Sequence, residues 1–309
     1  MLNRSQRDIM STWLKNTQPL VSVCCITYNH VDYISEALDS FLMQETNFPF
    51  EILVHDDAST DGTKNIILEY AENYPEIIKA VIQTENQYSK AGLIAHRFLF
   101  PKAKGKYIAL CEGDDYWTDC TKLQKQVQFL EDHPEYVITY TNSQAFNKNG
   151  LVNIDFGGAK RDVSADELKK CICLYSLTAC FRNVIKEVPL DLMSARLGDQ
   201  VIWSLLGAHG KGKYLADISP AAYRIHEGGV FSMKSKQQWI EMTLITSNAL
   251  FAYYKRIGDS DNASYFSERS CQLSVRAIGL KRVIILPIKL LIQKVLKLLK
   301  ESINNNLTS

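Results

Sequence analysis

The sequence predicts an α/β fold in which a mainly parallel, doubly wound central sheet is flanked by helices. In the first half of the chain, short apolar runs alternate with segments of helical periodicity, with little chain left between them. Polar residues follow directly after three of these runs, as they do at the ligand-binding edge of open sheets. The 309 residues suffice for one large α/β domain with an appendage or for two small domains.

Each predicted strand is a short, mostly apolar run bounded by polar or turn-forming residues. The strands cover residues 21–27, 51–55, 77–83, 107–111 and 136–141. The predicted helices between them cover residues 31–43, 63–74, 92–100 and 120–132. The last helix stops at His133-Pro134, because the residue before a proline avoids the helical region. After Asn142 the pattern loosens into a segment with glycine and asparagine that runs through Gly158.

The overall composition gives no sign of a nucleic-acid partner, since 35 basic residues balance 34 acidic ones. The eight cysteines are scattered through apparent core segments, and no Cys-x-x-Cys pair or histidine cluster has the spacing of a zinc site. We therefore expect a reduced, cytoplasmic setting. Residues 1–18 read as a polar extension without a secretory signal, and no run reaches the roughly 18 apolar residues of a membrane-spanning helix.

Two adjacent carboxylates, Asp114 and Asp115, stand where the apolar run 107–111 has just ended. Adjacent side chains on an extended backbone point to opposite sides, so the two aspartates are expected to do different jobs. One is suited to a hard cation such as Mg²⁺ or Mn²⁺ and the other to a ligand hydroxyl. The alternative is a turn followed by a helix cap, since aspartate is common in both places.

Three predicted strand ends carry polar residues that are expected to face one crevice. They are residues 27–30, 56–62 and 114–115. Together they offer what a nucleotide pocket needs, namely an aromatic face for a base, carboxylates for a ring N–H and for ribose hydroxyls, and a metal site for phosphates. The sequence has no glycine-rich phosphate loop, so a bound cation is expected to neutralise a diphosphate.

Three segments in order resemble the motifs of the family 2 glycosyltransferases, which have the GT-A fold. They are residues 21–29, 51–63 and 105–115. The resemblance runs from Pro19 to Arg224 and is clearest up to Thr141. It implies a GT-A catalytic domain over residues 19–234, with a nucleotide-sugar-binding half at 19–141 and an acceptor half at 142–234. Residues 235–309 are expected to add a helical C-terminal region.

The resemblance also implies roles for single residues. Asp57 maps to the aspartate that binds the base, and Tyr28 maps to the aromatic residue beside the base, with Thr27 next to it in the nucleotide-sugar site. Asp114 maps to the ribose contact, and Asp115 maps to the ligand of the metal, Mn²⁺ or Mg²⁺. The sequence departs from the common pattern at His55 and at Glu112-Gly113, and neither change removes one of these ligands.

Asp199 is the candidate general base, because the family's base sits at a similar turn that opens a helix. It stands just before the helix-like run 201–206. A base at this place takes a proton from a sugar hydroxyl as that oxygen attacks the anomeric carbon. The alternative is that Asp199 only caps the helix.

His226 lies in a loop whose paired glycines, Gly228 and Gly229, permit close approach of the backbone to a ligand. The resemblance offers His226 a role as a second metal ligand or a contact to the diphosphate, and Arg224 a role as a further phosphate contact. The glycines favour His226 over His30 for this role. The alternative is a solvated loop histidine.

The segment 280–300 carries six basic residues and no acidic one, and after Pro287 its apolar residues gather on one helical face. A basic amphipathic helix of this kind suits an anionic membrane surface, the inner leaflet where lipid-linked acceptors are found. The alternative is a helix docked on the catalytic domain or in a homo-oligomer.

The function that these features predict is an inverting, metal-dependent glycosyltransferase of cell-surface polysaccharide biosynthesis. It is expected to move a hexosyl or N-acetylhexosaminyl group from a nucleotide-sugar, with UDP as the nucleotide, to a hydroxyl of a glycan or lipid-linked acceptor. One alternative is a nucleotidyltransferase, which is expected to have a glycine-rich basic loop where this chain has residues 27–30. Another is a catalytically silent nucleotide-sugar-binding module.

Overall fold

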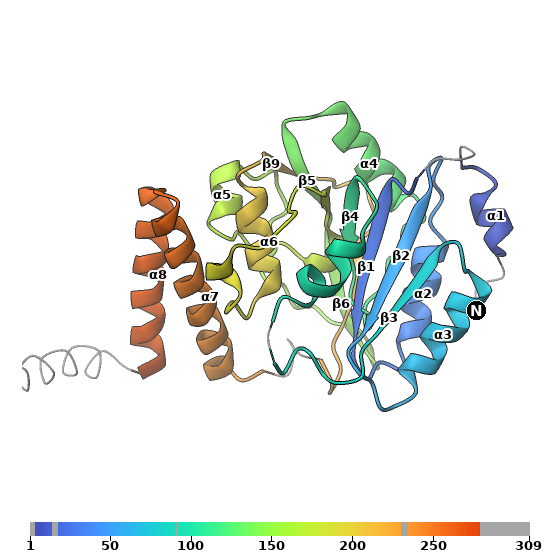
Figure 1. Ribbon diagram of the computed structural model, residues 1–309, viewed down its shortest axis with the longest axis horizontal. Helices are drawn as coiled ribbons and strands as arrows, with labels where there is room; N and C mark the ends of the chain where they lie inside the picture. The colour runs from blue at the N-terminus through green and yellow to red at the C-terminus, as the bar shows by residue number, and fades with distance from the viewer. Residues whose placement is uncertain (1–3, 14–17, 91, 230–233, 279–309) are drawn as a thin grey trace, which may run out of the picture. The chain divides into compact units, whose positions relative to one another are not determined.

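The structure is a computed structural model that describes residues 4–13, 18–90, 92–229 and 234–278. The chain divides into two compact units, Met1–Lys234 and Ser235–Ser309, which are described separately. Figure 1 labels their α-helices and most of their strands.

The first unit is built on a sheet that has seven strands within the described residues, in the order β3-β2-β1-β4-β8-β5-β9. The bounds of these strands are β1 (Val21–Thr27), β2 (Phe50–Asp56), β3 (Ile78–Ile82), β4 (Tyr107–Leu110), β5 (Tyr136–Tyr140), β8 (Cys180–Arg182) and β9 (Lys211–Tyr214). All neighbouring pairs are parallel except those of β8, which runs antiparallel to β4 and β5. The predicted mainly parallel sheet is thus confirmed.

Helices and short helical turns connect the strands of this unit. They are α1 (Gln6–Met10), α2 (Ile34–Leu42), α3 (Thr63–Asn73), η1 (Ala95–Leu99), η2 (Phe100–Lys102), α4 (Lys122–Asp132), α5 (Ala165–Lys169), η3 (Ser176–Thr178), η4 (Leu190–Leu192) and α6 (Gly198–Leu206).

The helix predicted over residues 92–100 is not a regular α-helix. Leu93 has a φ of 60°, which a helix does not admit, and the chain then forms one π-helical turn, η1, followed by the 3₁₀ turn η2. Pro101 at the start of η2 has no N–H with which to continue the α-helical hydrogen bonding.

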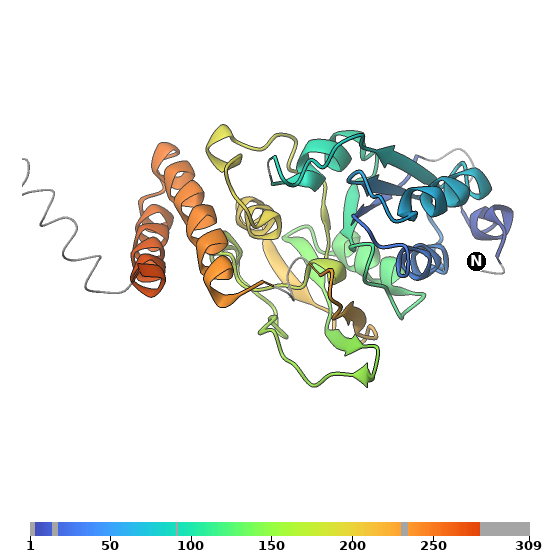
Figure 2. The same cartoon turned by 90° about the horizontal axis from the view of Figure 1, so that it is seen from below.

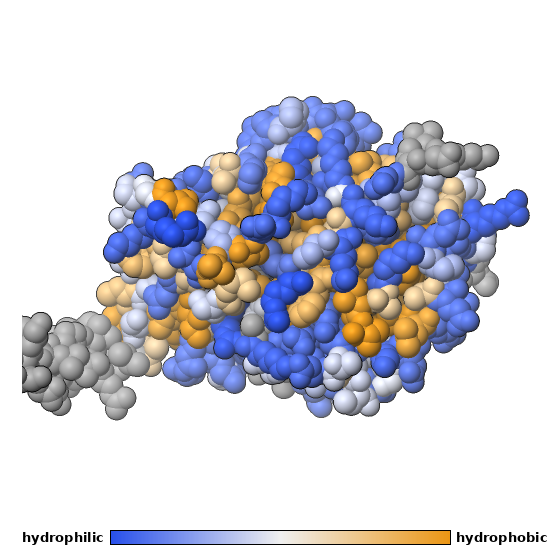
Figure 3. Space-filling view, viewed as in Figure 1, coloured by the Kyte–Doolittle hydropathy of each residue, from blue (hydrophilic) through white to orange (hydrophobic). Residues whose placement is uncertain are grey.

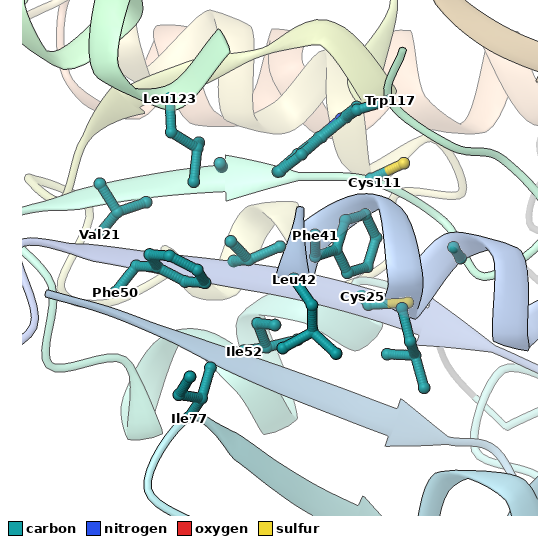
Figure 4. Close-up of a cluster of buried hydrophobic side chains, with 14 of the residues drawn as sticks. Val21, Cys25, Phe41, Leu42, Phe50, Ile52, Ile77, Cys111, Trp117 and Leu123 are labelled. Atoms are coloured by element: carbon teal, nitrogen blue, oxygen red, sulfur yellow. The ribbon is translucent and has the colours of Figure 1, made fainter. Parts of the chain in front are cut away.

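Successive residues of the central strands point to opposite faces of the sheet, and each face is covered by helices (Figure 2). Val23, Cys25 and Ile52 belong to a core cluster with residues of α2, α3 and α4. Within it the rings of Phe41 and Trp117, both labelled in Figure 4, have centroids 4.8 Å apart. Burying one such ring stabilises the fold by about 2 kcal/mol.

On the opposite face, η1, η2 and α6 cover the sheet. The ring of His55 in β2 stacks on Phe98 of η1 at 5.0 Å between centroids. Phe181 of β8 packs between Phe100 and Trp203, at 6.0 and 6.2 Å. Some large hydrophobic side chains stay exposed elsewhere on the chain, and Figure 3 shows such residues in orange among hydrophilic ones.

A small second sheet pairs two strands of the segment that the sequence pattern left loose, β6 and β7, with the distant strand β10. Its order is β10-β6-β7, with bounds β6 (Ser143–Asn147), β7 (Gly150–Leu151) and β10 (Ala221–Arg224). An isolated bridge joins Tyr116 to Ala222 of β10. This bridge fixes the residues that follow β4 against β10, although the two are more than a hundred residues apart in the chain.

The second unit contains two long helices that lie side by side, α7 (Lys236–Arg256) and α8 (Ser260–Ile278) (Figures 1 and 2). Ser235 and Gln238 form a capping box at the start of α7. The rings of Tyr254 and Phe266 stack at 5.7 Å between the helices. The helical C-terminal appendage is thus present, and the predicted basic amphipathic helix 280–300 lies outside the described residues. Among the helices in the described ranges, none has both the length and the apolar character to cross a membrane.

Candidate active site

The carboxyl ends of β1, β2 and β4 form one edge that carries most of the predicted site residues. The backbone ties the three ends together, since the Asp57 N–H donates to the Thr27 carbonyl at 3.0 Å and the Gly113 N–H donates to the Ile26 carbonyl at 2.9 Å. The strands themselves are parallel and adjacent, so their ends meet without a long connection.

Gly113 allows the chain after β4 to lie directly against β1. A Cβ at this position would be 2.7 Å from the Thr27 Cβ and 2.8 Å from its Oγ1, well inside normal contact. Thr27 is buried, and its Oγ1 has no hydrogen-bond partner within the described part of the chain. The predicted place of Thr27 in the nucleotide-sugar site stays a prediction.

Asp114 lies between two histidines. Its Oδ2 is 3.0 Å from Nε2 of His226 and 3.7 Å from Nε2 of His30. Burial alone would raise the pKa of Asp114, but the hydrogen bond from His226 and the charges of His30 and His226 bring it below its usual value. The three side chains form a group whose ligand atoms are all within 4.8 Å of one another.

Asp115 has a different partner. Its carboxylate is buried, and Oδ1 accepts the Arg224 backbone N–H at 2.7 Å. Burial, with the charges of Asp114 and Glu112, raises the pKa of Asp115 well above its usual value. The two aspartates therefore have different partners, and the structure groups Asp114 rather than Asp115 with the histidines. The sequence-based assignment of Asp115 to a metal stays a prediction.

The Arg224 side chain is already engaged. Its Nε donates to the Asp114 carbonyl at 2.8 Å, and its guanidinium forms an ion pair with Glu36. The guanidinium also lies over the rings of Tyr33 and Phe146, at 4.6 and 4.5 Å from their centroids. Arg224 thus braces the loop that carries Asp114, and its predicted contact to the nucleotide-sugar stays untested.

Asp57 and Tyr28 stand at the other side of the same edge. The buried Asp57 carboxylate accepts the backbone N–H groups of Gln87 at 2.8 Å and of Tyr88 at 3.0 Å. A carboxylate has about four acceptor positions, so room remains for a ring N–H of a base. The ring of Tyr28 is 42% exposed, as a stacking surface for a ligand must be.

Asp199 is the second residue of α6. The N-cap position belongs to Leu197, which makes no side-chain cap hydrogen bond, and Asp199 lies in the first turn of the helix, so the alternative that Asp199 only caps the helix stays open. Asp199 as a residue is half-buried, and burial raises the pKa of its carboxyl, while a hydrogen bond from the Gln200 backbone N–H acts in the opposite direction. Its charge contributes to raising the pKa of Glu112. Asp199 therefore lies within electrostatic reach of the end of β4.

Sequence reasoning assigned no role to two residues at this edge, Glu112 and His30, and it preferred His226 to His30 as a metal ligand. Glu112 accepts the Ser176 hydroxyl on Oε1 at 2.8 Å, and its buried Oε2 has no hydrogen-bond partner in the described residues. Burial first, and then the charge of Asp114, raises the pKa of Glu112 to about 7. The available signal for both was their place directly after a strand, at the edge where ligands bind.

The family model described as "Glycosyl transferase family 2" matches residues 22–188. An uncharacterized protein of Mycobacterium tuberculosis is 35% identical over 217 residues, which are 68% of this chain and 60% of that protein. The chain thus spans less than two thirds of the length of this relative. The Escherichia coli UDP-Glc:alpha-D-GlcNAc-diphosphoundecaprenol beta-1,3-glucosyltransferase WfaP is 27% identical, with 77% of this chain and 90% of WfaP covered.

Two solved structures are similar to the fold. Staphylococcus aureus TarS (residues 1–349) in complex with UDP has a TM-score of 0.56 at 18% identity and covers 85% of this chain and 73% of that one. The mannosyltransferase PcManGT of Pyrobaculum calidifontis, in complex with GDP-Man and Mn²⁺, has a TM-score of 0.51 at 17% identity. The match covers 90% of this chain and 81% of the PcManGT chain. These likenesses concern the fold, which is GT-A.

Proposed function

The chain belongs to glycosyl transferase family 2, and on this premise we propose that it moves a sugar from a UDP-sugar to a hydroxyl of a glycan or lipid-linked acceptor in cell-surface polysaccharide synthesis. The relative WfaP supports both halves of the proposal, since its name gives UDP-Glc as donor and a diphosphoundecaprenol-linked sugar as acceptor. The complex of TarS with UDP-GlcNAc supports a UDP-sugar donor of the hexosyl or N-acetylhexosaminyl type.

The observation that carries the proposal is the group formed by His30 after β1, Asp114 after β4 and His226 after β10. A carboxylate and imidazole nitrogens are donors that Mn²⁺ accepts, so the residues fit a divalent cation. Mn²⁺ stands in the printed name of the PcManGT complex. When bound, such a cation would neutralise charge on the diphosphate leaving group. We propose Asp114 and His226 as its ligands in place of the sequence-based choice of Asp115.

The donor nucleoside is held, in this proposal, by the residues on the β1 and β2 side of the edge. Asp57 accepts a ring N–H of the base, while the exposed ring of Tyr28 lies against the base and Thr27 lines the pocket below it. Arg224 keeps the Asp114 loop in place through its bond to the Asp114 carbonyl. Because these contacts come from the sheet edge, the site is preorganised before the donor arrives.

Asp199 is the proposed general base. It removes the proton of the acceptor hydroxyl while that oxygen bonds to the anomeric carbon and the bond from this carbon to the diphosphate breaks, with inversion at the carbon. Burial raises the pKa of Asp199, which makes its carboxylate a stronger base than one in water. Its partly exposed position at the start of α6 leaves it open to an acceptor.

A transfer assay with a panel of UDP-sugars, beside calorimetric titration with UDP and Mn²⁺, tests the proposal. Asp199→Asn should keep UDP and Mn²⁺ affinity while transfer falls by about 10²-fold or more, because only the base is lost. Asp191→Asn, in the nearby turn η4, is the control for removing a carboxylate. Binding of UDP with no transfer by the wild-type protein would point to a silent binding module. Normal transfer by Asp199→Asn would remove Asp199 from the chemistry.

We further propose that the protein works at the inner membrane surface through residues 280–300. Support comes from the six basic residues of this segment, each worth about 1 kcal/mol near an anionic surface, and from the lipid-linked acceptor in the name of WfaP. A chain truncated after Ile278 should still bind UDP but no longer sediment with anionic vesicles at low salt. If the full-length and the truncated protein sediment equally with the vesicles, residues 280–300 belong to the fold or to a homo-oligomer interface instead.

A further inference from the structure

His30 is a second histidine beside Asp114 for which the family resemblance supplied no role. We propose that His30 is a third protein ligand of the active-site cation and that it makes the site prefer a transition-metal ion such as Mn²⁺ over Mg²⁺. This inference rests on the proposed function, which places a divalent cation at Asp114 and His226.

The distances from Asp114 to the two histidines are those of ligand atoms around one ion, and all three ligand atoms lie within 4.8 Å of one another. Asp114 Oδ2 is 3.0 Å from His226 Nε2 and 3.7 Å from His30 Nε2. Two ligand atoms that are each about 2.1 Å from an ion lie about 3.0 Å apart at 90° and about 3.6 Å apart at 120°. The distance from His30 to Asp114 is too long for a hydrogen bond, so hydrogen bonding alone does not account for the position of the ring.

The loop before His30 is held in an unusual conformation that directs this side chain. Asn29 has a φ of 55°, which is uncommon outside glycine. Its backbone N–H donates to Ser59 Oγ at 2.8 Å, and its Oδ1 accepts the Thr60 N–H at 2.9 Å. The His30 N–H donates to Thr63 Oγ1 at 2.8 Å. Conformations of this kind persist where the surroundings enforce them, and they are frequent at ligand sites.

The His30 ring is turned away from solvent and toward the other two ligands. Its side chain is 11% exposed, and the rings of His30 and His226 are nearly perpendicular, with centroids 5.7 Å apart. Its Nδ1 is buried without a hydrogen-bond partner in the part of the chain that the structure describes. Neither solvation nor a protein hydrogen bond therefore explains why a polar ring is placed here.

The ligand set has a consequence for the choice of metal. Mg²⁺ takes oxygen ligands almost exclusively, whereas transition-metal ions accept imidazole nitrogen, and their affinity for such ligands rises from Mn²⁺ toward Co²⁺ and Ni²⁺. A site with two imidazoles and one carboxylate is therefore expected to discriminate against Mg²⁺. Removal of one imidazole should weaken Mn²⁺ binding more than Mg²⁺ binding.

The test measures Mn²⁺ and Mg²⁺ affinity by calorimetry, for each metal alone and with UDP, in the full chain and in three variants. His30→Ala should weaken Mn²⁺ binding by at least about 10-fold and Mg²⁺ binding by a smaller factor. His30→Asp replaces the nitrogen by a carboxylate and should lower the ratio of Mn²⁺ to Mg²⁺ affinity while Mg²⁺ binding strengthens. A protein that fails to fold cannot show this gain. His209→Ala, at an exposed histidine after α6, is the matched control.

Pulsed electron paramagnetic resonance of bound Mn²⁺ gives an independent readout, because it detects directly coordinated nitrogen. Two imidazole nitrogens in the wild type and one in His30→Ala would support the proposal. Unchanged Mn²⁺ affinity and an unchanged nitrogen signal in His30→Ala would overturn it and leave the proposed function standing. If the wild-type protein binds neither ion, with or without UDP, both this inference and the proposed metal site fail.

Discussion

Replacing Gly113 by alanine adds one methyl group at the point where the chain after β4 meets β1. The new Cβ would lie 2.7 Å from the Thr27 Cβ, 2.8 Å from its Oγ1 and 3.0 Å from Ile34 Cδ1. Thr27 and Ile34 are 1% and 0% exposed, so neither side chain has space to retreat. The clash must therefore be relieved by moving the segment that carries Asp114.

The expected cost follows from these contacts. Forcing a methyl group into a packed site destabilises a protein by about 1 to 3 kcal/mol. For a unit of this size each kcal/mol lowers the melting temperature by about 2 to 4 °C, so Gly113→Ala should melt about 2 to 12 °C below the wild type. Since Asp114 is the next residue, a shift of about 1 Å should also lower transfer by about 100-fold.

Thermal unfolding followed by circular dichroism measures the first effect and a transfer assay measures the second, while Mn²⁺ titration shows whether the Asp114 segment has moved. Gly198→Ala is the matched control for stability, because its Cβ would meet Leu93 at 3.6 Å from Cδ2 and 3.9 Å from Cα, both ordinary contact distances. This control should melt as the wild type does. A Gly113→Ala protein with the melting temperature and Mn²⁺ affinity of the wild type would refute the argument that close packing against Thr27 holds the Asp114 segment in place.

Three further predictions follow from single contacts. Asp114→Asn should abolish Mn²⁺ binding. Asp115→Asn should retain part of the Mn²⁺ affinity and lower stability, because the Asp115 carboxylate accepts the Arg224 backbone N–H. Calorimetry in which Asp115→Asn loses more Mn²⁺ affinity than Asp114→Asn would restore Asp115 as the metal ligand. Burial lowers the pKa of His96 to about 4 from its usual 6.5. Between these two pH values the unfolded chain binds a proton at His96 that the folded chain does not bind. The stability that neutral His96 contributes is therefore complete above pH 6.5 and is lost as the pH falls toward 4. In urea unfolding, the wild type should lose up to about 3 kcal/mol of unfolding free energy through His96 as the pH falls from 6.5 to 4, and His96→Phe should not show this loss. The same pH dependence in variant and wild type would contradict this. Ser235→Ala should destabilise α7 by about 1 kcal/mol because it removes the N-cap, and equal urea midpoints for variant and wild type would contradict that.

The sequence by itself predicted strands β1 to β5 and their binding edge, whereas β8 and β9 of the same sheet were not predicted. Five predicted strands match β1 to β5 to within about two residues at each end, because runs of apolar residues that must be buried on both faces are a local signal. The polar residues after β1, β2 and β4 could be placed at one edge of the sheet because neighbouring parallel strands end at the same edge.

The loose segment after Asn142 was harder to predict. β6 and β7 are short, and β6 gains its stability from pairing with β10, which lies far along the chain. The helix predicted over 92–100 was wrong in type because Leu93 and Pro101 impose a backbone that periodicity does not reveal. The local pattern thus failed after Asn142 because the strands pair with a distant partner, and it failed over 92–100 because of the backbone geometry.

Only the tertiary structure decided which aspartate faces the histidines. Asp114 and Asp115 are adjacent and chemically alike, so no local pattern distinguishes them. His226 reaches Asp114 across 112 residues, while Asp115 accepts the Arg224 N–H across 109. Both contacts depend on β10 lying beside Tyr116, a pairing that follows from how the whole chain folds and from no segment of it alone.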